Sequence, residues 1–244
     1  MKKIIIFAAL LVVSLSGLAQ NVQFHYDLGH ALSDDLENRP AVTTTVEMFK
    51  PDAWGSTFLF TDLDYFSDGV AGAYWEVSRE LNVSANKQWA AHVEYNGGLS
   101  SDKERYTTSR FQHAFLVGPA WNWHSADFSR TFSLQAMYKR YFKGQYASAF
   151  NSFQATAVWS VSLANSLFTF SGFLDYWYNP DVDGKWILLS EPQFWLNLNS
   201  LRGMNGVNLS VGTEIEVSNN FVWNKNGENY HFYAIPTLAF KWTF

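Results

Sequence analysis

Acidic and aromatic side chains recur together along this sequence, and in combination they could bind a small polar solute. Aromatic rings stack on flat bases or on the faces of sugars, while ionised carboxylates accept hydrogen bonds from hydroxyl and amino groups. The candidate binding residues are Glu47, Phe49, Phe58, Phe60, Asp62, Asp64, Tyr74, Glu76, Phe173 and Asp175. The alternative interpretation is a network of inward charges that only hydrates or plugs the protein interior.

The sequence contains no motif typical of a catalytic site or of a metal site. The sequence has no Cys, no Gly-x-Ser-x-Gly motif, and no pair among its six His at spacings of two or four. We therefore predict no enzyme activity, no metal site and no cofactor. A lipid-modifying enzyme, which would need a Ser and a His together at a membrane edge, remains an alternative.

The candidates lie in stretches where apolar and polar residues alternate with a period of two, which indicates β-strands. Turn-forming residues separate twelve such stretches, and short connections mostly alternate with longer ones. An even strand number with this alternation is typical of an outer-membrane β-barrel. The stretches are residues 21–28, 41–50, 54–64, 70–80, 87–96, 110–123, 128–141, 152–163, 167–178, 185–199, 206–218 and 229–244.

The two faces of these strands differ in the way a membrane barrel requires. In the first stretch, Phe24 and Tyr26 alternate with Gln23, His25 and Asp27. Aromatic residues make up 18% of the chain, yet the mean hydropathy is only −0.14. A soluble lipocalin-like barrel or sandwich would instead bury its apolar face. We predict an all-β fold, a transmembrane antiparallel up-and-down β-barrel of about twelve strands, with the acidic face toward its lumen.

The first residues resemble an export leader. Lys2 and Lys3 precede the apolar run 4–13, and small residues at Gly17 and Ala19 favour cleavage after Ala19. We expect a signal peptide over residues 1–19 and a barrel domain over 20–244, placed in the bacterial outer membrane. Loss of the two lysines would change the formal net charge from −5 to −7, which argues against a nucleic-acid partner.

Two parts of the chain resemble the Tsx-like nucleoside-specific channel family of outer-membrane proteins. They are residues 45–50 with Trp54 and 58–64, and Leu116-Val117-Gly118-Pro119 with Trp121 and Trp123. The chain is also similar to an uncharacterised branch of that superfamily, known mainly as a domain of unknown function. The resemblance implies a monomeric twelve-strand barrel whose narrow lumen binds nucleosides. Its matched lumen positions are Glu47, Phe49, Phe58, Phe60, Asp62 and Asp64.

We therefore predict a passive outer-membrane channel for a small polar solute, such as a nucleoside. Its expected partners are outer-membrane lipid and the barrel-assembly machinery, which would bind the C-terminal strand ending at Phe244. Further inward candidates are His25, His92, His231, Lys139 and Tyr233. We expect His113 to face outward with Phe111, Phe115 and Val117. A second alternative is a non-conducting structural or adhesive barrel, plugged by aromatic residues and by ion pairs of Lys139 with a neighbouring carboxylate.

Overall fold

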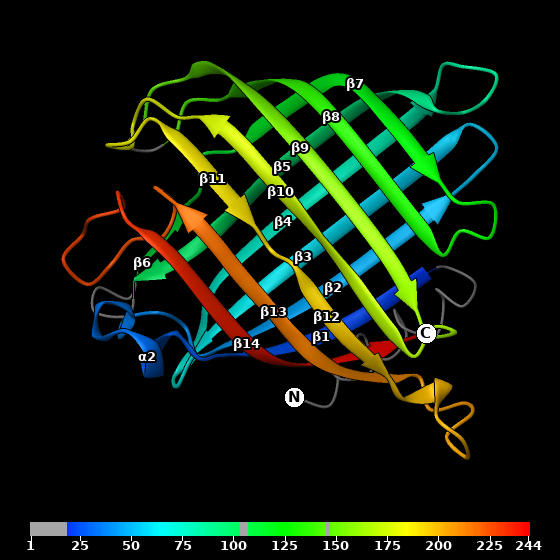
Figure 1. The fold of residues 1–244 in the computed structure, drawn as a ribbon. Helices are drawn as coiled ribbons and strands as arrows, with labels where there is room; N and C mark the ends of the chain where they lie inside the picture. The colour runs from blue at the N-terminus through cyan, green and yellow to red at the C-terminus, as the bar shows by residue number, and fades with distance from the viewer. Residues whose placement is uncertain (1–18, 103–106, 145–146) are drawn as a thin grey trace, which may run out of the picture.

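The computed structural model describes residues 19–102, 107–144 and 147–244, and it folds into one closed antiparallel β-barrel (Figure 1). Neighbouring strands pair along the chain, and the barrel closes because β1 also pairs with β14. The strands are β1 (Ala19–Asp27), β2 (Val42–Pro51), β3 (Gly55–Phe66), β4 (Gly69–Asn82), β5 (Trp89–Asp102), β6 (Thr107–Arg110), β7 (Ala114–His124), β8 (Arg130–Tyr141), β9 (Phe150–Leu163), β10 (Phe168–Tyr178), β11 (Trp186–Ser190), β12 (Gln193–Asn197), β13 (Leu209–Asn219) and β14 (Phe232–Thr243). The predicted leader falls on residues that lie almost entirely outside this description, although Ala19 begins β1.

Two of the twelve positions around the barrel are each filled by a broken strand. β11 and β12 both pair with β10 and with β13, while β6 and β7 both pair with β5. The prediction of an all-β barrel with twelve strands is therefore confirmed. The expected loop over residues 97–109 is wrong in part, because β5 continues to Asp102 and pairs there with β6.

Each strand break has a local physical cause. Pro192 separates β11 from β12, and it has no backbone N–H to donate to the ladder. Between β6 and β7, residues 111–113 lie opposite only Gly97 and Gly98, because Arg110 pairs with Leu99 and Ala114 with Asn96. This extra residue is a β-bulge, and it reverses the inward and outward alternation on one side of it. Phe111 therefore lies on the lumen side, contrary to the sequence prediction, while His113 lies outward as predicted.

The two faces of the sheet are chemically distinct. In β1, Phe24 and Tyr26 are 52% and 54% exposed, whereas Gln23 and His25 are 0% and 3% exposed. The apolar set therefore forms the exterior and the polar set the lumen. Backbone groups of a closed barrel pair with neighbouring strands, so this exterior can meet lipid without unpaired N–H or C=O groups.

The ends of the barrel differ in their connections. The end that carries β1's start and β14's finish has short turns, such as Ala164 to Ser166, where all three residues have positive φ. We call this the terminal end. The opposite, loop end carries longer segments, including α2 (Gly29–Leu32) and η1 (Asp34–Leu36). A third short helix, η2 (Leu198–Ser200), lies at the terminal end.

Of the helices in residues 19–102, 107–144 and 147–244, none has the length and apolar character needed to cross a bilayer.

Close strand contact at Gly118 yields a test of the fold. A Cβ atom at this position would lie 2.1 Å from the Ala136 carbonyl oxygen, so Gly118→Ala must displace β8. We expect a loss of about 1–3 kcal/mol in unfolding free energy, measured from the urea midpoint of the folded barrel. Gly144→Ala is the control, because its Cβ would meet nothing nearer than 3.7 Å. Equal midpoints for the two variants would contradict the strand contact.

Candidate solute-binding lumen

All ten candidate residues lie on the lumen face of the barrel. Eight come from the adjacent strands β2, β3 and β4, where cross-strand pairs such as Glu47 with Phe60 and Phe60 with Glu76 share that face. Phe173 and Asp175 lie on β10, which stands on the opposite wall (Figure 1). Glu76 and Asp175 interact electrostatically across the lumen. The fold therefore brings both groups of candidates to one interior space.

Neighbouring hydroxyl groups hold the candidate carboxylates in place. Thr43 and Thr45 donate hydrogen bonds of 2.6 and 2.5 Å to Asp64 and Asp62. Tyr74 donates one of 2.6 Å to Glu76, and Thr156 donates to Asp175. A carboxylate has about four lone-pair positions, so each keeps acceptor capacity for a solute in the lumen.

Aromatic rings form a continuous row along the same wall. Ring centroids are 5.9 Å apart between Phe58 and Phe60, 5.9 Å between Phe60 and Tyr74, and 6.3 Å between Tyr74 and Phe111. We call these four residues the aromatic ladder. Three of them were predicted from the sequence, but Phe111 was missed because the bulge beside it reverses the strand alternation.

Two lysines elsewhere in the lumen, Lys139 on β8 and Lys241 on β14, pack on aromatic rings. Lys139 Nζ lies 4.9 Å and 5.0 Å from the ring centroids of Tyr141 and Trp177, and 2.7 Å from Gln154 Oε1. Lys241 Nζ lies 4.1 Å from the Trp195 ring. Lys139 thus points inward as predicted, but its hydrogen-bond partner is an amide oxygen rather than a carboxylate.

The inward histidines pair with carboxylates. His92 lies 3.3 Å from Glu80 and 3.1 Å from Glu94, and His25 lies 3.7 Å from Glu214. His231 instead lies in the loop after β13, 3.2 Å from Glu228. Tyr233 packs against a buried cluster at the loop end of the barrel. The described residues contain no group of three or more His, Asp or Glu placed to hold a metal ion.

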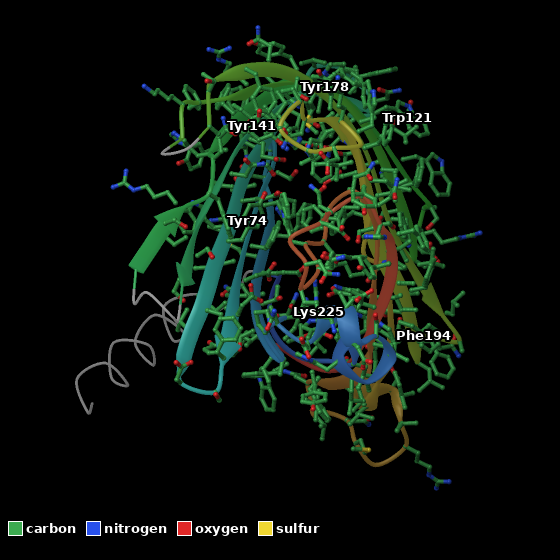
Figure 2. All side chains as sticks on the ribbon, turned by 90° about the vertical axis from the view of Figure 1, so that its left-hand side faces the viewer. Tyr74, Trp121, Tyr141, Tyr178, Phe194 and Lys225 are labelled. Carbon is green, nitrogen blue, oxygen red and sulfur yellow. The ribbon has the colours of Figure 1, made fainter. Side chains whose placement is uncertain are left out.

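Two loops fold into the loop end of the barrel. Leu36 from η1 and Val222 from the loop after β13 are buried against Ile235 of β14. The Lys225 backbone N–H donates to the Asp35 carbonyl oxygen at 2.9 Å, so the two loops also bind each other. Figure 2, which faces this end, places Lys225 beside α2 within the ring of strands. We call loops 28–41 and 220–231 the mouth loops.

An ion-pair bridge fixes the first mouth loop to the barrel wall. Arg39 donates to Asp27 of β1 at 3.0 Å and to Glu216 of β13 at 2.9 Å. The Arg39 side chain is 23% exposed, and both carboxylates are less exposed. Charge-assisted hydrogen bonds in such a shielded place are stronger than pairs on an open surface.

The second mouth loop has its own polar anchor at Glu228. Hydrogen bonds from His231, Asn224 and Tyr230 hold the pKa of the Glu228 carboxyl below its ordinary value. The carboxylate therefore remains ionised somewhat below the pH at which an unfolded chain would protonate it. These contacts are complete above the ordinary pKa and are lost as the pH falls through the lowered one.

Solvent reaches the lumen unevenly. Leu116, Met137 and Trp195 on the side of β7, β8 and β12 are 0% exposed. On β3, every residue is partly exposed, including the ladder rings Phe58 and Phe60. The accessible part of the lumen thus runs along the wall that carries most of the candidate residues.

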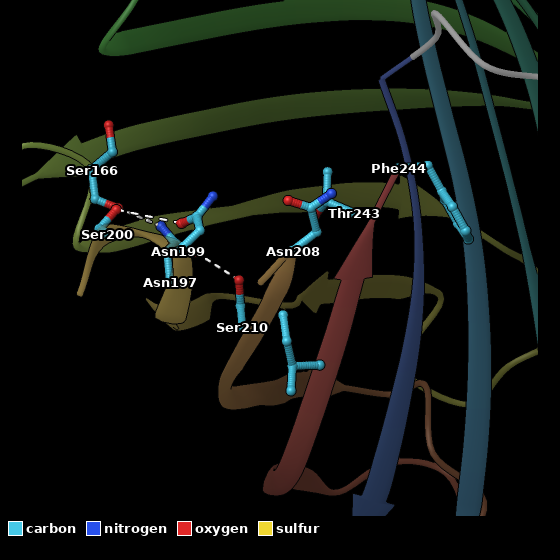
Figure 3. Close-up of a pocket in the computed structure, with 9 residues that line it drawn as sticks. Ser166, Asn197, Asn199, Ser200, Asn208, Ser210, Thr243 and Phe244 are labelled. Atoms are coloured by element: carbon cyan, nitrogen blue, oxygen red, sulfur yellow. Dashed lines mark hydrogen bonds between the residues drawn. The ribbon is translucent and has the colours of Figure 1, made fainter. Parts of the chain in front are cut away.

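A polar pocket of about 280 Å³ lies at the terminal end (Figure 3). Its side chains largely bind one another: Asn197 donates to the Ser166 carbonyl oxygen at 2.7 Å and accepts from Ser210 at 2.7 Å. The pocket also includes Thr243 and Phe244 at the end of the chain. None of the predicted binding residues lies in it.

A closed barrel with an apolar exterior and a polar lumen has the architecture of a membrane-type β-barrel. The chain belongs to the family described as a domain of unknown function (DUF5020), whose model matches residues 19–244. A search of curated proteins gave no match. The narrower likeness to Tsx-like channels is not confirmed by these comparisons.

The solved structure of the NanC porin shares the fold of this barrel. The NanC porin superposes with a TM-score of 0.58 at 14% identity, covering 93% of this chain and 99% of that one. The outer-membrane channel DcaP of Acinetobacter baumannii gives 0.40 at 10% identity, covering 85% and 65%. The β domain of the Bordetella autotransporter BrkA gives 0.35 at 8%, covering 93% and 99%. Of these three, only the NanC likeness has a TM-score above 0.5, and at 14% identity it shows a shared fold alone.

The Arg39 bridge can be tested by removing its charge. Arg39→Gln leaves Asp27 and Glu216 without their cation, so the first mouth loop should loosen and unfolding free energy should fall by about 1–3 kcal/mol. Because the two loops bind each other, trypsin should also cleave faster after Lys225, as measured by mass spectrometry of the folded barrel.

Arg110→Gln is the matched control, since Arg110 is exposed on β6. Unchanged cleavage after Lys225 in Arg39→Gln would show that the bridge does not hold the mouth loops.

Proposed function

We propose that this protein is an outer-membrane channel for passive passage of a small polar solute. The observation that carries the proposal is the partly exposed lumen wall of β2–β4, where carboxylates and aromatic rings lie side by side. Selectivity in a channel depends on the groups that line its lumen. Weak, repeated sites of this kind allow a solute both to enter and to leave.

The exterior of the barrel supports the proposed location. Its exposed apolar residues include Phe115 and Val117 on β7 and Leu238 and Phe240 on β14. A soluble protein rarely exposes apolar surface over so many strands. We propose that the mature chain is a monomer in the bacterial outer membrane, exported by the leader and assembled through the terminal strand ending at Phe244.

Nucleosides are the first solutes to test. A base can stack on the ring of Phe60 or Phe58, while the ribose hydroxyls can donate to Asp62 and Asp64 on the same strand. Phe49 and Glu47 extend this surface along β2, and Phe173 and Asp175 face it from β10. The support is chemical complementarity between these groups and a nucleoside.

A non-conducting structural barrel is the second candidate. It is favoured by the mouth loops, which pack into the loop end and are fixed there by Arg39. We do not propose an enzyme. Within the described residues, the histidine rings bind Thr237, Gln23, Glu80, Glu94, Tyr95, Glu228 and the Ser125 carbonyl, and no hydrogen bond joins a serine hydroxyl to a histidine.

The test is conductance of the purified protein in planar lipid bilayers. We expect small single-channel steps that uridine or adenosine blocks. Phe60→Ala should raise the half-blocking concentration by about fivefold or more, because a stacking contact of a base is worth about 1–3 kcal/mol. Leu59→Ala is the control, since Leu59 pairs with Val77 on the outer face.

The outcomes separate the candidates. Absence of conductance in the folded wild-type protein would reject the channel and favour the structural barrel. Conductance that nucleosides do not block would retain the channel and reject nucleosides as its solutes.

A further inference from the structure

We propose that the aromatic ladder is a binding track for organic cations that carry a ring. This inference rests on the proposed channel and deepens it by naming a solute class. The members of the ladder, Phe58 and Phe60 of β3, Tyr74 of β4 and Phe111 of the bulge between β6 and β7, form one row of neighbouring rings.

The barrel makes specific room for the last ring of the row. A Cβ atom on Gly98 would lie 2.4 Å from the Phe111 ring, so only glycine allows the ring to lie over β5. Gly98 pairs with Tyr74 on the lumen face, which brings Phe111 next to the Tyr74 ring. Phe111 is 43% exposed, so the ladder begins at an accessible position. The bulge and the glycine together extend the row of rings by one residue.

Two lysine side chains show how ammonium groups are bound inside this barrel. Lys139 on β8 packs on the rings of Tyr141 and Trp177, and Lys241 on β14 packs on Trp195. The wall with the ladder also presents ring faces, and carboxylates lie beside them. However, β3 and β4 contribute no Lys or Arg to their lumen faces, because Arg79 lies on the outer face with Thr57. A mobile cation bound there would occupy the place that the lysine ammonium groups occupy on the other lumen rings.

The charges beside the ladder favour a cation over a neutral or anionic ring. Asp62 and Asp64 lie on β3, and Glu76 lies beside Tyr74 on β4 and accepts its hydroxyl hydrogen. Carboxylates in a shielded lumen attract cations and repel anions. Aromatic faces add a cation–π attraction of about 0.5–1 kcal/mol at an accessible site. A protonated amine with an aromatic ring can use both contacts simultaneously.

The test compares three probes that share one ring and differ in charge. Phenethylamine is cationic at neutral pH, 2-phenylethanol is neutral and phenylacetate is anionic. In planar bilayers, we expect phenethylamine to block at a concentration about fivefold lower than 2-phenylethanol, and phenylacetate to block least. Equal block by all three probes would overturn the proposal.

Two variants assign the effect to the track. Phe111→Ala should raise the half-blocking concentration of phenethylamine about two- to fivefold, whereas the control Phe115→Ala, on the outer face of β7, should not. Glu76→Gln should reduce the preference for the amine over the alcohol. An unchanged response in both Phe111→Ala and Glu76→Gln would show that block occurs elsewhere.

Calorimetric titration of phenethylamine into the folded barrel in detergent separates this inference from the proposed function. Binding that weakens in Phe111→Ala, without conductance in bilayers, would uphold the track and reject the channel. Conductance without such binding would uphold the channel and reject the track. Absence of both would reject the two together.

Discussion

The structure depends on the pairing of β1 with β14. An open sheet would leave a row of backbone N–H and C=O groups without partners, which a bilayer cannot satisfy. Residues from Asn21 to Asp27 pair with Thr243 to Thr237, so the first and last described strands complete the hydrogen-bond ladder. Closure also fixes the register, because a shift of one residue would turn Phe24 inward and His25 outward. The separation of lipid face and lumen face thus follows from closure.

Side chains on the two sides of the lumen differ in how far they are buried. Trp195, Leu116 and Met137 fill one side, and the mouth loops cover the loop end. On β3, in contrast, rings and carboxylates are partly exposed. A solute there would meet the ladder on one side and Asp175 on the other. The packing of one half of the lumen therefore determines which residues of the other half can meet a solute.

Much of this arrangement could be predicted from the sequence, because alternation with a period of two reports directly which residues share a face. That pattern gave the strands, their number and the lumen face of all ten candidates. It failed at Phe111, since a one-residue bulge reverses the alternation without leaving a Gly or Pro signal at that residue. It also could not place the mouth loops, because their contacts join segments far apart in sequence. It could not pair Lys139 with Gln154 either, because alternation does not give the register between the neighbouring strands β8 and β9.

The effect of the lumen carboxylates on a solute depends on which of them have a cationic partner inside the protein. Some acids have internal partners: Glu80 and Glu94 bind His92, while Asp27 and Glu216 bind Arg39. The acids beside the ladder are bound only by neutral hydroxyl groups from Thr43, Thr45 and Tyr74 among their described hydrogen bonds. The wall with the accessible rings therefore carries carboxylates that, in the described residues, have no hydrogen bond from Lys or Arg, and these two properties together favour a cation there.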